Sequence, residues 1–528
     1  MIKIDQVKLH IDQDISQIGS VVAHKLKISE KAINKLEIIK SSVDARKKPE
    51  IFLVYSVVIT VSSTDEKKIL AKFKRDNNVN LYIPKNYSLP KLNGTHEDRP
   101  LIIGAGPAGL FAAYILALAG LNPIVFERGK RVEDRTEDVL NFWKTGILDT
   151  KSNVQFGEGG AGTFSDGKLN TLVNDKLGRN KFVLETFVKF GAPSNILYDY
   201  KPHIGTDILS KVISYMRNEI ISLGGEFHFE TKIDSFIIEQ YRIIGVSSMG
   251  KQFYGNHVIL AVGHSARDTF EVLHKCGIYM EAKDFAVGFR VEHPQEFISK
   301  TMYSTAYDKL PPAPYKLATN LDNGRGVYSF CMCPGGFVVN SSSEDNRLVV
   351  NGMSYSKRDS NNANSAIVVS VGEKEFDKSN PLAGIEYQRQ LEHKAFELCQ
   401  GKIPQQLFGD FKAKRLSTSY GDFASETRGA TGFGMLSDIF SQEVNQSIID
   451  GMGIFGTKIK EFDRDDAIFS GVESRTSSPV RIRRDELYQA NIAGLYPCGE
   501  GAGYAGGITS AAMDGMKVAE AVIADLNL

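Results

Sequence analysis

A glycine turn between a short apolar strand and a helix is the feature that most restricts how this chain folds. The spacing G-x-G-x-x-G begins at Gly104, directly after Leu101-Ile102-Ile103, and the helical stretch Leu110 to Leu118 follows it. Such a loop turns tightly, lets a pyrophosphate approach its backbone and points a helix N-terminus at the phosphates. We therefore predict a dinucleotide-binding βαβ unit at this point of the sequence.

The next strand supports the same unit. Pro123 to Phe126 reads as a strand that ends at Glu127, whose carboxylate would accept hydrogen bonds from the ribose hydroxyls of an adenosine and repel a 2′-phosphate. The alternative is a doubly wound sheet whose glycines serve packing only, and the loop alone does not choose between FAD and NAD. The cofactor contacts expected from this unit are Gly104, Ala105, Gly106, Pro107, Ala108, Gly109, Glu127 and Arg128.

The same spacing occurs three more times, and with 48 glycines in the chain some matches arise by chance. The match at Gly451, Gly453 and Gly456 follows a predicted helix, Ser441 to Ile449, with no strand before it, so we exclude it. The match beginning at Gly501 follows Leu495 to Glu500, which reads as a strand entering a glycine-acid turn, and precedes a helix, Thr509 to Leu526. The match beginning at Gly157 lies in a segment, Val154 to Lys168, that is too rich in glycine for a helix or a strand.

These segments together resemble the glutathione-reductase-like superfamily of two-domain FAD enzymes. A closer resemblance, from about residue 1 to the end, is to a mostly uncharacterised group called FAD-utilising dehydrogenases. Its most distinctive phrases here are Gly157 to Leu169, Ser329 to Gly336, Glu473 to Pro479 and Tyr496 to Gly507. The resemblance implies FAD, bound non-covalently, and it supplies no substrate.

The resemblance also implies where the flavin half of FAD would lie. A late glycine-acid turn, here Gly499-Glu500, meets the ribityl and phosphate part, and the helix that follows points its N-terminus at the flavin pyrimidine. The superfamily usually has aspartate where this chain has Glu500. A Gly-Gly segment passes against the isoalloxazine, and a strand like Val258 to Gly263 precedes closure of the site. These expectations add Gly159, Gly160, Ala161, Gly162, Thr163, Phe164, Gly263, Gly499, Glu500, Gly506, Gly507 and Ile508 to the cofactor-binding residues.

The alternation of apolar strands and helices after residue 100 predicts an α/β chain. We expect a Rossmann-like FAD/NAD(P)-binding domain at 100–274 and 456–528, with an inserted mixed α+β substrate or cap domain at 275–455. A small basic α+β domain at 1–83 and a linker at 84–99 precede them. Within the first domain we expect strands at Lys3 to Ile11 and Ile51 to Val61, and a helix from Ser29 to the basic cluster Arg46-Lys47-Lys48. Further on we expect a helix at Ile204 to Leu223 and strands at Glu226 to Thr231 and Phe236 to Val246.

Composition excludes several classes of function. The 63 basic and 63 acidic side chains give a formal net charge of zero, which argues against a chain that coats nucleic acid or anionic membrane as a whole. The uncharged stretch Leu101 to Phe126 carries the glycine turn and Pro123, so strand, turn, helix and strand fit it better than a membrane span. Five cysteines and an N-terminus without a signal-peptide pattern favour a reducing cytosol. The basic excess in the first hundred residues leaves RNA contact open, although solvated surface charge is the simpler reading and a nucleic-acid partner is not expected.

No single catalytic residue and no metal site can be predicted. Cys331 and Cys333 form a C-x-C that is either a strained redox pair or, as we favour, two small residues in a turn. His264 is a candidate acid or base, or a cap, and Tyr504 is placed to approach the flavin. Arg290 and Arg475 would clamp an anionic substrate or the pyrophosphate, or form ordinary salt bridges, and Arg267 lies with His264 at the mouth of the nucleotide domain.

The function expected is that of an FAD-dependent oxidoreductase of unknown substrate, with hydride passing through flavin N5. The alternatives are an NAD-dependent dehydrogenase without flavin and a flavoprotein that associates with RNA or modifies it.

Overall fold

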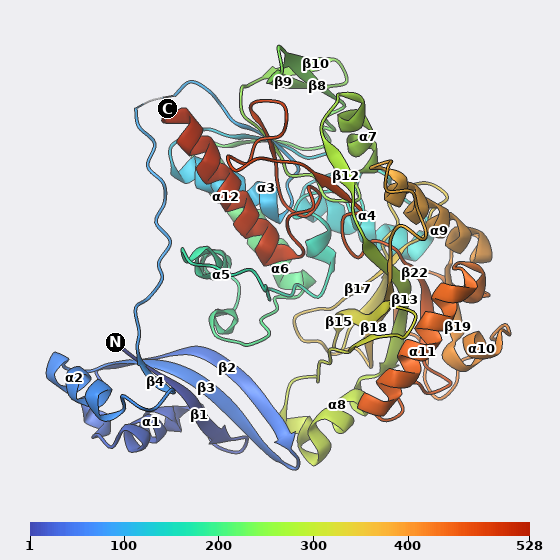
Figure 1. The fold of residues 1–528 in the computed structure, drawn as a ribbon. Helices are drawn as coiled ribbons and strands as arrows, with labels where there is room; N and C mark the ends of the chain where they lie inside the picture. The colour runs from blue at the N-terminus through green and yellow to red at the C-terminus, as the bar shows by residue number, and fades with distance from the viewer. Residues whose placement is uncertain (95) are drawn as a thin grey trace.

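The computed structural model describes residues 1–94 and 96–528 (Figure 1). One of its main units is built on a five-stranded parallel sheet. Its order is β24-β11-β5-β6-β7, and every neighbouring pair is parallel. The chain therefore enters this sheet at its central strand, β5, and adds β6 and β7 on one side. It then crosses over to add β11 and β24 on the other side, which places the topological switch point between β5 and β11. The strands are β5 (Leu101–Ile103), β6 (Ile124–Phe126), β7 (Glu226–His228), β11 (Val258–Leu260) and β24 (Leu495–Pro497).

Alternate side chains of these strands enter two separate cores, because successive residues of a strand face opposite sides. Ile102, Val125 and Ile259 pack under the helices on one face, whereas Leu101, Phe126 and Leu260 face an antiparallel three-stranded sheet and a helix on the other. The helices of the first face are α3 (Pro107–Leu118), α5 (Arg179–Lys189), α6 (Thr206–Ser222) and α12 (Ile508–Leu526), with α4 (Val132–Thr145) beside α6. The opposite face is covered by β8 (Ser235–Glu239), β9 (Arg242–Ser248), β10 (Lys251–Tyr254) and α7 (Arg267–Lys275).

The first 81 residues form a separate antiparallel sheet of order β2-β3-β1-β4, covered on one face by two helices (Figure 1). Its elements are β1 (Ile2–His10), α1 (Ile18–Leu26), β2 (Lys35–Lys47), β3 (Glu50–Thr60), α2 (Ser63–Lys72) and β4 (Val79–Leu81). Strand β2 also contacts the rest of the chain, because Ser41 N–H donates to the carbonyl of Tyr198 at 2.6 Å and its carbonyl accepts from Tyr200 N–H at 2.8 Å. Residues 82–94 and 96–100 lie between this sheet and β5.

The remaining unit is built on a seven-stranded sheet of order β14-β15-β18-β13-β22-β19-β21, with a smaller sheet β17-β16-β20 beside it. Its strands are β13 (Phe285–Pro294), β14 (Ala318–Asn320), β15 (Gly326–Cys333), β16 (Phe337–Asn340), β17 (Val350–Met353), β18 (Asn362–Val371), β19 (Ile403–Leu407), β20 (Thr427–Arg428), β21 (Thr431–Phe433) and β22 (Ile468–Glu473). Its helices are α8 (Gln295–Tyr303), α9 (Ala383–Cys399), α10 (Phe408–Ala413) and α11 (Gln442–Lys458). The antiparallel pair of β12 (Met280–Ala282) and β23 (Val480–Ile482) lies where the chain enters and leaves this unit.

Three sequence-based expectations are wrong. The helix expected from Ser29 to Lys48 is instead a 3₁₀ turn, Glu30–Ala32, followed by β2, because the strand pairs along its length with the buried β3. The single strand Phe236 to Val246 is a hairpin of β8 and β9, which turns at Gln240 and Tyr241, both with positive φ.

The third error concerns the inserted unit, which does not end at residue 455. Strand β22 pairs with β13 and β19 inside the seven-stranded sheet, so the unit continues to the end of that strand. The excluded glycine match at 451–456 lies within α11, where Gly451 packs closely on Val327.

The uncharged stretch Leu101–Phe126 folds as β5, α3 and β6. Among the described residues, no helix combines the length and the apolar character that crossing a membrane requires.

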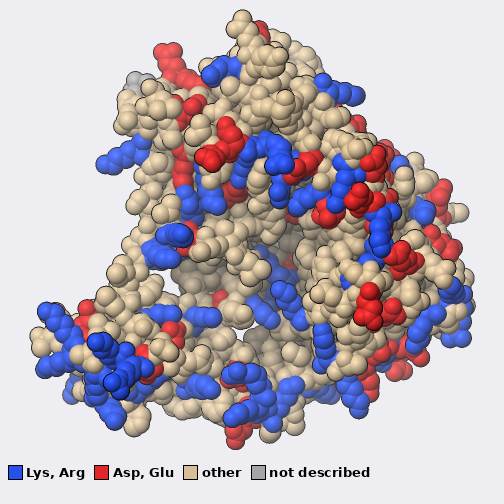
Figure 2. Space-filling view, in the orientation of Figure 1, with Lys and Arg blue, Asp and Glu red and all other residues tan. Residues whose placement is uncertain are grey.

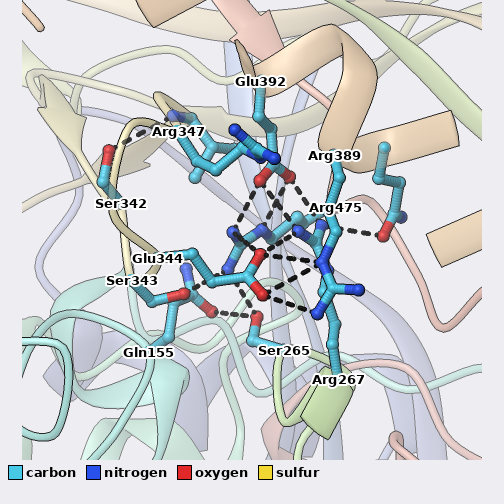
Figure 3. A network of polar contacts seen from close by, with 12 residues as sticks. Gln155, Ser265, Arg267, Ser342, Ser343, Glu344, Arg347, Arg389, Glu392 and Arg475 are labelled. Atoms are coloured by element: carbon cyan, nitrogen blue, oxygen red, sulfur yellow. Dashed lines mark hydrogen bonds and ion pairs between the residues drawn. The ribbon is translucent and has the colours of Figure 1, made fainter. Parts of the chain in front are cut away.

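A buried network of charges joins the parallel-sheet unit to the inserted unit (Figure 3). Glu392 of α9 accepts hydrogen bonds from Arg267 of α7 at 2.6 and 2.9 Å and from Arg475, just after β22, at 2.7 and 2.9 Å. Arg267 also donates to Glu344, which in turn accepts from Arg389. Burial alone would raise the pKa of Glu392, but Arg267 and Arg475 hold it well below its usual range. Arg475, one of the two candidate anion clamps, is therefore engaged together with Arg267 in joining the two units.

We expect Glu392→Gln to lower the free energy of unfolding by about 3–5 kcal/mol, because it leaves two buried guanidinium groups without their shared counter-ion. Chemical denaturation of the full chain measures this. Glu386→Gln on the same helix is the matched control, since Glu386 is exposed and its pair with Arg389 contributes less than about 1 kcal/mol. Equal unfolding free energies for the two variants would contradict this role for Glu392.

Candidate functional site

The first glycine loop lies at the carboxyl end of β5, and its three glycines are required for different reasons. Gly104 has φ +103°, and a Cβ there would lie 2.6 Å from the carbonyl oxygen of Ala261; at Gly109 a Cβ would lie 1.9 Å from the carbonyl oxygen of Gly104. Gly106 has φ −77°, and the nearest atom to a Cβ would be Gly160 Cα at 3.8 Å. The fold therefore requires glycine at Gly104 and Gly109 but not at Gly106.

Glu127, at the end of β6, holds three loops together through backbone hydrogen bonds. Its Oε2 accepts from the N–H of Ala105 at 2.9 Å, and its Oε1 accepts from the N–H groups of Gly129 and Gly157, each at 3.0 Å. A carboxylate has about four acceptor directions, so three bonds leave one for a ribose hydroxyl. The neighbouring Arg128 pairs with Asp268 of α7 at 2.9 Å and stacks on Phe156.

The glycine-rich segment 157–164 has little regular structure of its own beyond a 3₁₀ turn at Ala161–Phe164. Arg135 of α4 fixes its path. The guanidinium of Arg135 is fully buried and donates to five backbone carbonyls, those of Asn153, Val154, Gly157, Glu158 and Gly160, at 2.7–3.2 Å. Gly159 N–H donates to the carbonyl of Ala105 at 2.8 Å, which ties this segment to the first glycine loop.

The late glycine-acid turn reaches the same place from β24. Because β11 lies between β5 and β24, the ends of the three strands are neighbours, and a Cβ at Gly499 would lie 2.8 Å from that of Ala108. Glu500 accepts from Gly507 N–H at 3.3 Å and lies 3.4 Å from Nδ1 of His264. A Cβ at Gly162 would lie 2.9 Å from Ile508 at the start of α12, so all three glycine segments meet at one edge of the sheet.

Three glycines at this edge have no explanation in the protein's own packing. Gly106, Gly263 and Gly506 lack a left-handed φ, and a Cβ on Gly263 or Gly506 would meet no atom within 4 Å. Gly263 and Gly506 are also exposed to solvent. A molecule that lies against the backbone would require these positions to lack side chains, which is the fit expected of an extended dinucleotide.

Two of the cofactor residues expected from the sequence have side chains that are buried in the protein. Thr163 and Phe164 are buried, and Phe164 packs edge-on against Trp143 in a separate small core. The other expected positions, from Gly104 to Gly109, from Gly159 to Gly162, and at Gly263, Gly499, Glu500, Gly506, Gly507 and Ile508, lie on the loops that converge there.

The candidate catalytic side chains are engaged in structural contacts. Arg290 is fully buried, pairs with both oxygens of Glu473 at 2.9 and 3.0 Å and donates to the carbonyl of Cys331 at 3.2 Å. Cys331 and Cys333 are free thiols at a bulge of β15, and burial raises the pKa of Cys333 to about 11. Tyr504 stacks against Arg484, which itself pairs with Asp514 of α12.

Sequence reasoning missed Arg135, and its local pattern holds no signal for it. It is one of many charged residues on an amphipathic helix, and its partners are carbonyl groups, which every residue carries.

The comparisons with known proteins come from sequence and from structure. Residues 284–476 match a family model described as "FAD-dependent protein, C-terminal domain-like", and residues 1–60 match a domain of unknown function. An uncharacterised protein of Clostridium beijerinckii is 45% identical over 535 residues, which cover 100% of this chain and 99% of that protein. The chain belongs to the same family as this clostridial protein. The first match identifies FAD as the cofactor, and the matched residues include β22.

Three solved structures are among those with some similarity to this chain. Glycerol-3-phosphate dehydrogenase from Bacillus halodurans, complexed with FAD, is 13% identical with a TM-score of 0.37; the match covers 82% of this chain and 65% of that one, less than two thirds of its length. Quinol fumarate reductase of E. coli is 10% identical with a TM-score of 0.37, covering 81% and 70%. A flavoprotein/dehydrogenase from Cytophaga hutchinsonii is 11% identical with a TM-score of 0.36, covering 81% and 79%.

We expect Arg135→Lys to lower the free energy of unfolding by about 3 kcal/mol and to weaken FAD retention, because one ammonium cannot donate to five buried carbonyls. Denaturation and flavin absorbance of the purified chain measure the two effects. The control is Arg131→Lys, since Arg131 is exposed and immediately precedes the same helix. Full stability and full flavin content in Arg135→Lys would show that the glycine segment keeps its path without this side chain.

Proposed function

We propose that this chain is an oxidoreductase that holds FAD non-covalently along the carboxyl edge of its parallel sheet. The observation that carries the proposal is the set of open glycines, Gly106, Gly263 and Gly506, which the fold does not require and which line the edge where three glycine segments meet. Similarity to the glutathione-reductase-like superfamily, on the same segments, agrees with this arrangement.

The adenosine diphosphate half of FAD would lie at the first loop. The N–H groups at the start of α3, after Gly106, would bind the pyrophosphate, and the remaining acceptor direction of Glu127 would bind the ribose. The topological switch between β5 and β11, where such ligands bind in open α/β sheets, is at the same place.

The flavin half would lie between the segment Gly159 to Gly162 and the N-terminus of α12. Bound FAD supplies the capacity to accept or donate a hydride at N5. The first turn of α12, after Gly507, presents unpaired N–H groups and a positive dipole end, which stabilise negative charge on the pyrimidine side of a reduced flavin. Glu500 and His264 lie beside this turn, where the carboxylate receives a bond from Gly507 N–H and so fixes the path of the loop.

A nicotinamide enzyme without flavin is less well supported. It would use the first loop but would leave Gly263, Gly506 and the turn before α12 without a function, and the family model over residues 284–476 describes an FAD-dependent protein.

We expect Gly106→Ala to weaken FAD binding by about tenfold or more without lowering the melting temperature, because the new methyl group meets the cofactor and not the protein. Fluorescence titration of the flavin-depleted chain with FAD measures the dissociation constant.

Gly453→Ala is the matched control, since Gly453 is the middle glycine of the excluded match and lies exposed in α11. This change should leave FAD binding unaltered and raise helix stability slightly. The proposal would be wrong if both variants bound FAD like the unaltered chain, or if the unaltered chain took up no FAD.

A further inference from the structure

A group of basic side chains, Lys168, Lys201 and Arg358, lies next to the proposed flavin half of the site; we call it the basic cluster. Lys168 and His203 form a β-bridge, and Leu169 N–H donates to the carbonyl of Pro202 at 2.9 Å, so Lys168 and Lys201 are carried on adjacent paired segments. Arg358 comes from the inserted unit, in the loop between β17 and β18. The cluster is thus assembled from two units of the chain.

Asp166 is the acid at the centre of the basic cluster. It is 1% exposed, accepts from Nε of Arg358 at 3.0 Å and lies 3.0 Å from Nζ of Lys168, with Ser354 as a further donor. Burial alone would raise the pKa of Asp166, but Lys168 and Arg358 lower it to about 2, so it is ionised. Asp166 carries one negative charge and therefore neutralises only one of the three positive charges in the cluster.

The cluster retains unused donors. A guanidinium has five N–H groups, and Arg358 directs only its Nε and one Nη at Asp166. Lys201 makes no ion pair or hydrogen bond with any residue that the structure describes. The pKa values of Lys201 and His203 are lowered by burial and by the charges of Arg358 and Lys168, which agrees with a surplus of positive charge at this point.

The position of the cluster relative to α12 links it to the flavin. Lys168 lies four residues after the glycine-rich segment 157–164, and the carbonyl of the next residue, Leu169, accepts from the hydroxyl of Thr509 in the first turn of α12 at 2.9 Å. The molecule is hollowed between the N-terminal unit and the rest of the chain, and Lys and Arg side chains lie in this hollow (Figure 2). Lys40 of β2 lies over the ring of Tyr200 at 4.8 Å, next to Lys201, and so brings the N-terminal unit to the edge of the cluster.

The loop that carries Arg358 needs a particular glycine. Gly335 has φ +47°, and a Cβ there would lie 1.8 Å from the carbonyl oxygen of Arg358. The phrase Cys331-Met332-Cys333-Pro334-Gly335-Gly336, which offered a redox pair as one reading, therefore contains the residue that allows Arg358 to reach Asp166.

We propose that the basic cluster binds an anionic group, a carboxylate or a phosphate, of the molecule that exchanges a hydride with the flavin. An interdomain salt bridge alone would need one cation for Asp166, whereas Lys168 and Arg358 both contact it. Lys201 adds a third positive charge close enough to both cations to have its pKa lowered by them, and N–H donors of Arg358 remain free. Arginine and lysine donors in a desolvated site bind such oxyanions through charge-assisted hydrogen bonds. The inference rests on the proposed function, since it takes the flavin to lie at the N-terminus of α12.

The test is a calorimetric titration of the full chain, as isolated with its flavin, with succinate and with inorganic phosphate at constant ionic strength. Succinamide is the uncharged counterpart of succinate. We expect one of the two anions to bind and to shift the flavin absorption, and succinamide not to bind; the tighter of the two anions identifies the carboxylate or the phosphate as the group recognised. Lys201→Met should weaken this binding about tenfold, and Arg358→Lys should weaken it at least as much.

Lys74→Met, which removes an exposed lysine of the N-terminal unit, is the matched control and should bind the anion like the unaltered chain. Lys201 is outside the ion pair with Asp166, so its variant reports on binding even if Arg358→Lys unfolds the interdomain contact. No anion binding, or equal binding in Lys201→Met and Lys74→Met, would overturn the inference. Flavin content measured in the same samples keeps the two proposals separate, because a chain that holds FAD and binds no anion overturns only this one.

Discussion

The constraint on which the site depends is that a segment with almost no side chains must be held open beside two helix termini. Glycine-rich backbone is costly to order, because it has more conformational freedom to lose than any other sequence. Arg135 and Glu127 provide that order through hydrogen bonds to the backbone. One donates to five carbonyls of the segment, and the other accepts from N–H groups of three different loops. Both side chains are fully or nearly fully buried, and a buried polar group without a hydrogen-bond partner would lower the stability of the fold.

A second consequence is that the site belongs to no single unit of the chain. The parallel sheet contributes the strand ends and the glycine loops, and the inserted unit contributes Arg358. Two charge networks join these units, one at Asp166 and the other at Glu392 (Figure 3). A change that separates the units would thus disturb the flavin side of the site even where it touches no predicted cofactor residue.

Features that depend on a few adjacent residues could be predicted from the sequence, and features that depend on distant residues could not. The turn at Gly104, the strand ending at Glu127 and the helix predicted from Thr509 each depend on a few adjacent residues. The structure has the turn and the strand as expected, and the helix begins one residue earlier, at Ile508. Strand β2 was mistaken for a helix because its identity depends on pairing with β3, which lies later in the chain. The hairpin at Gln240 and Tyr241 has neither glycine nor asparagine at its turn, so the sequence contains no turn signal at this position.

The features that join distant parts of the chain were not predicted, because their signal is not contained in adjacent residues. Strand β22 completes a sheet begun some 180 residues earlier, and Arg135 acts on carbonyl groups that leave no trace in a sequence. The basic cluster was also not foreseen, because Lys168, Lys201 and Arg358 become neighbours only through the pairing of Lys168 with His203 and the turn at Gly335.

The central claim is that the first loop and the turn before α12 bind opposite halves of one FAD molecule. Calorimetric titration of the flavin-free chain with FAD, repeated in the presence of ADP and of FMN, tests it most directly. The account predicts one FAD bound per chain, with ADP and FMN each binding more weakly than FAD and each competing with it. Absence of FAD binding, or FAD binding that neither half-molecule weakens, would contradict it.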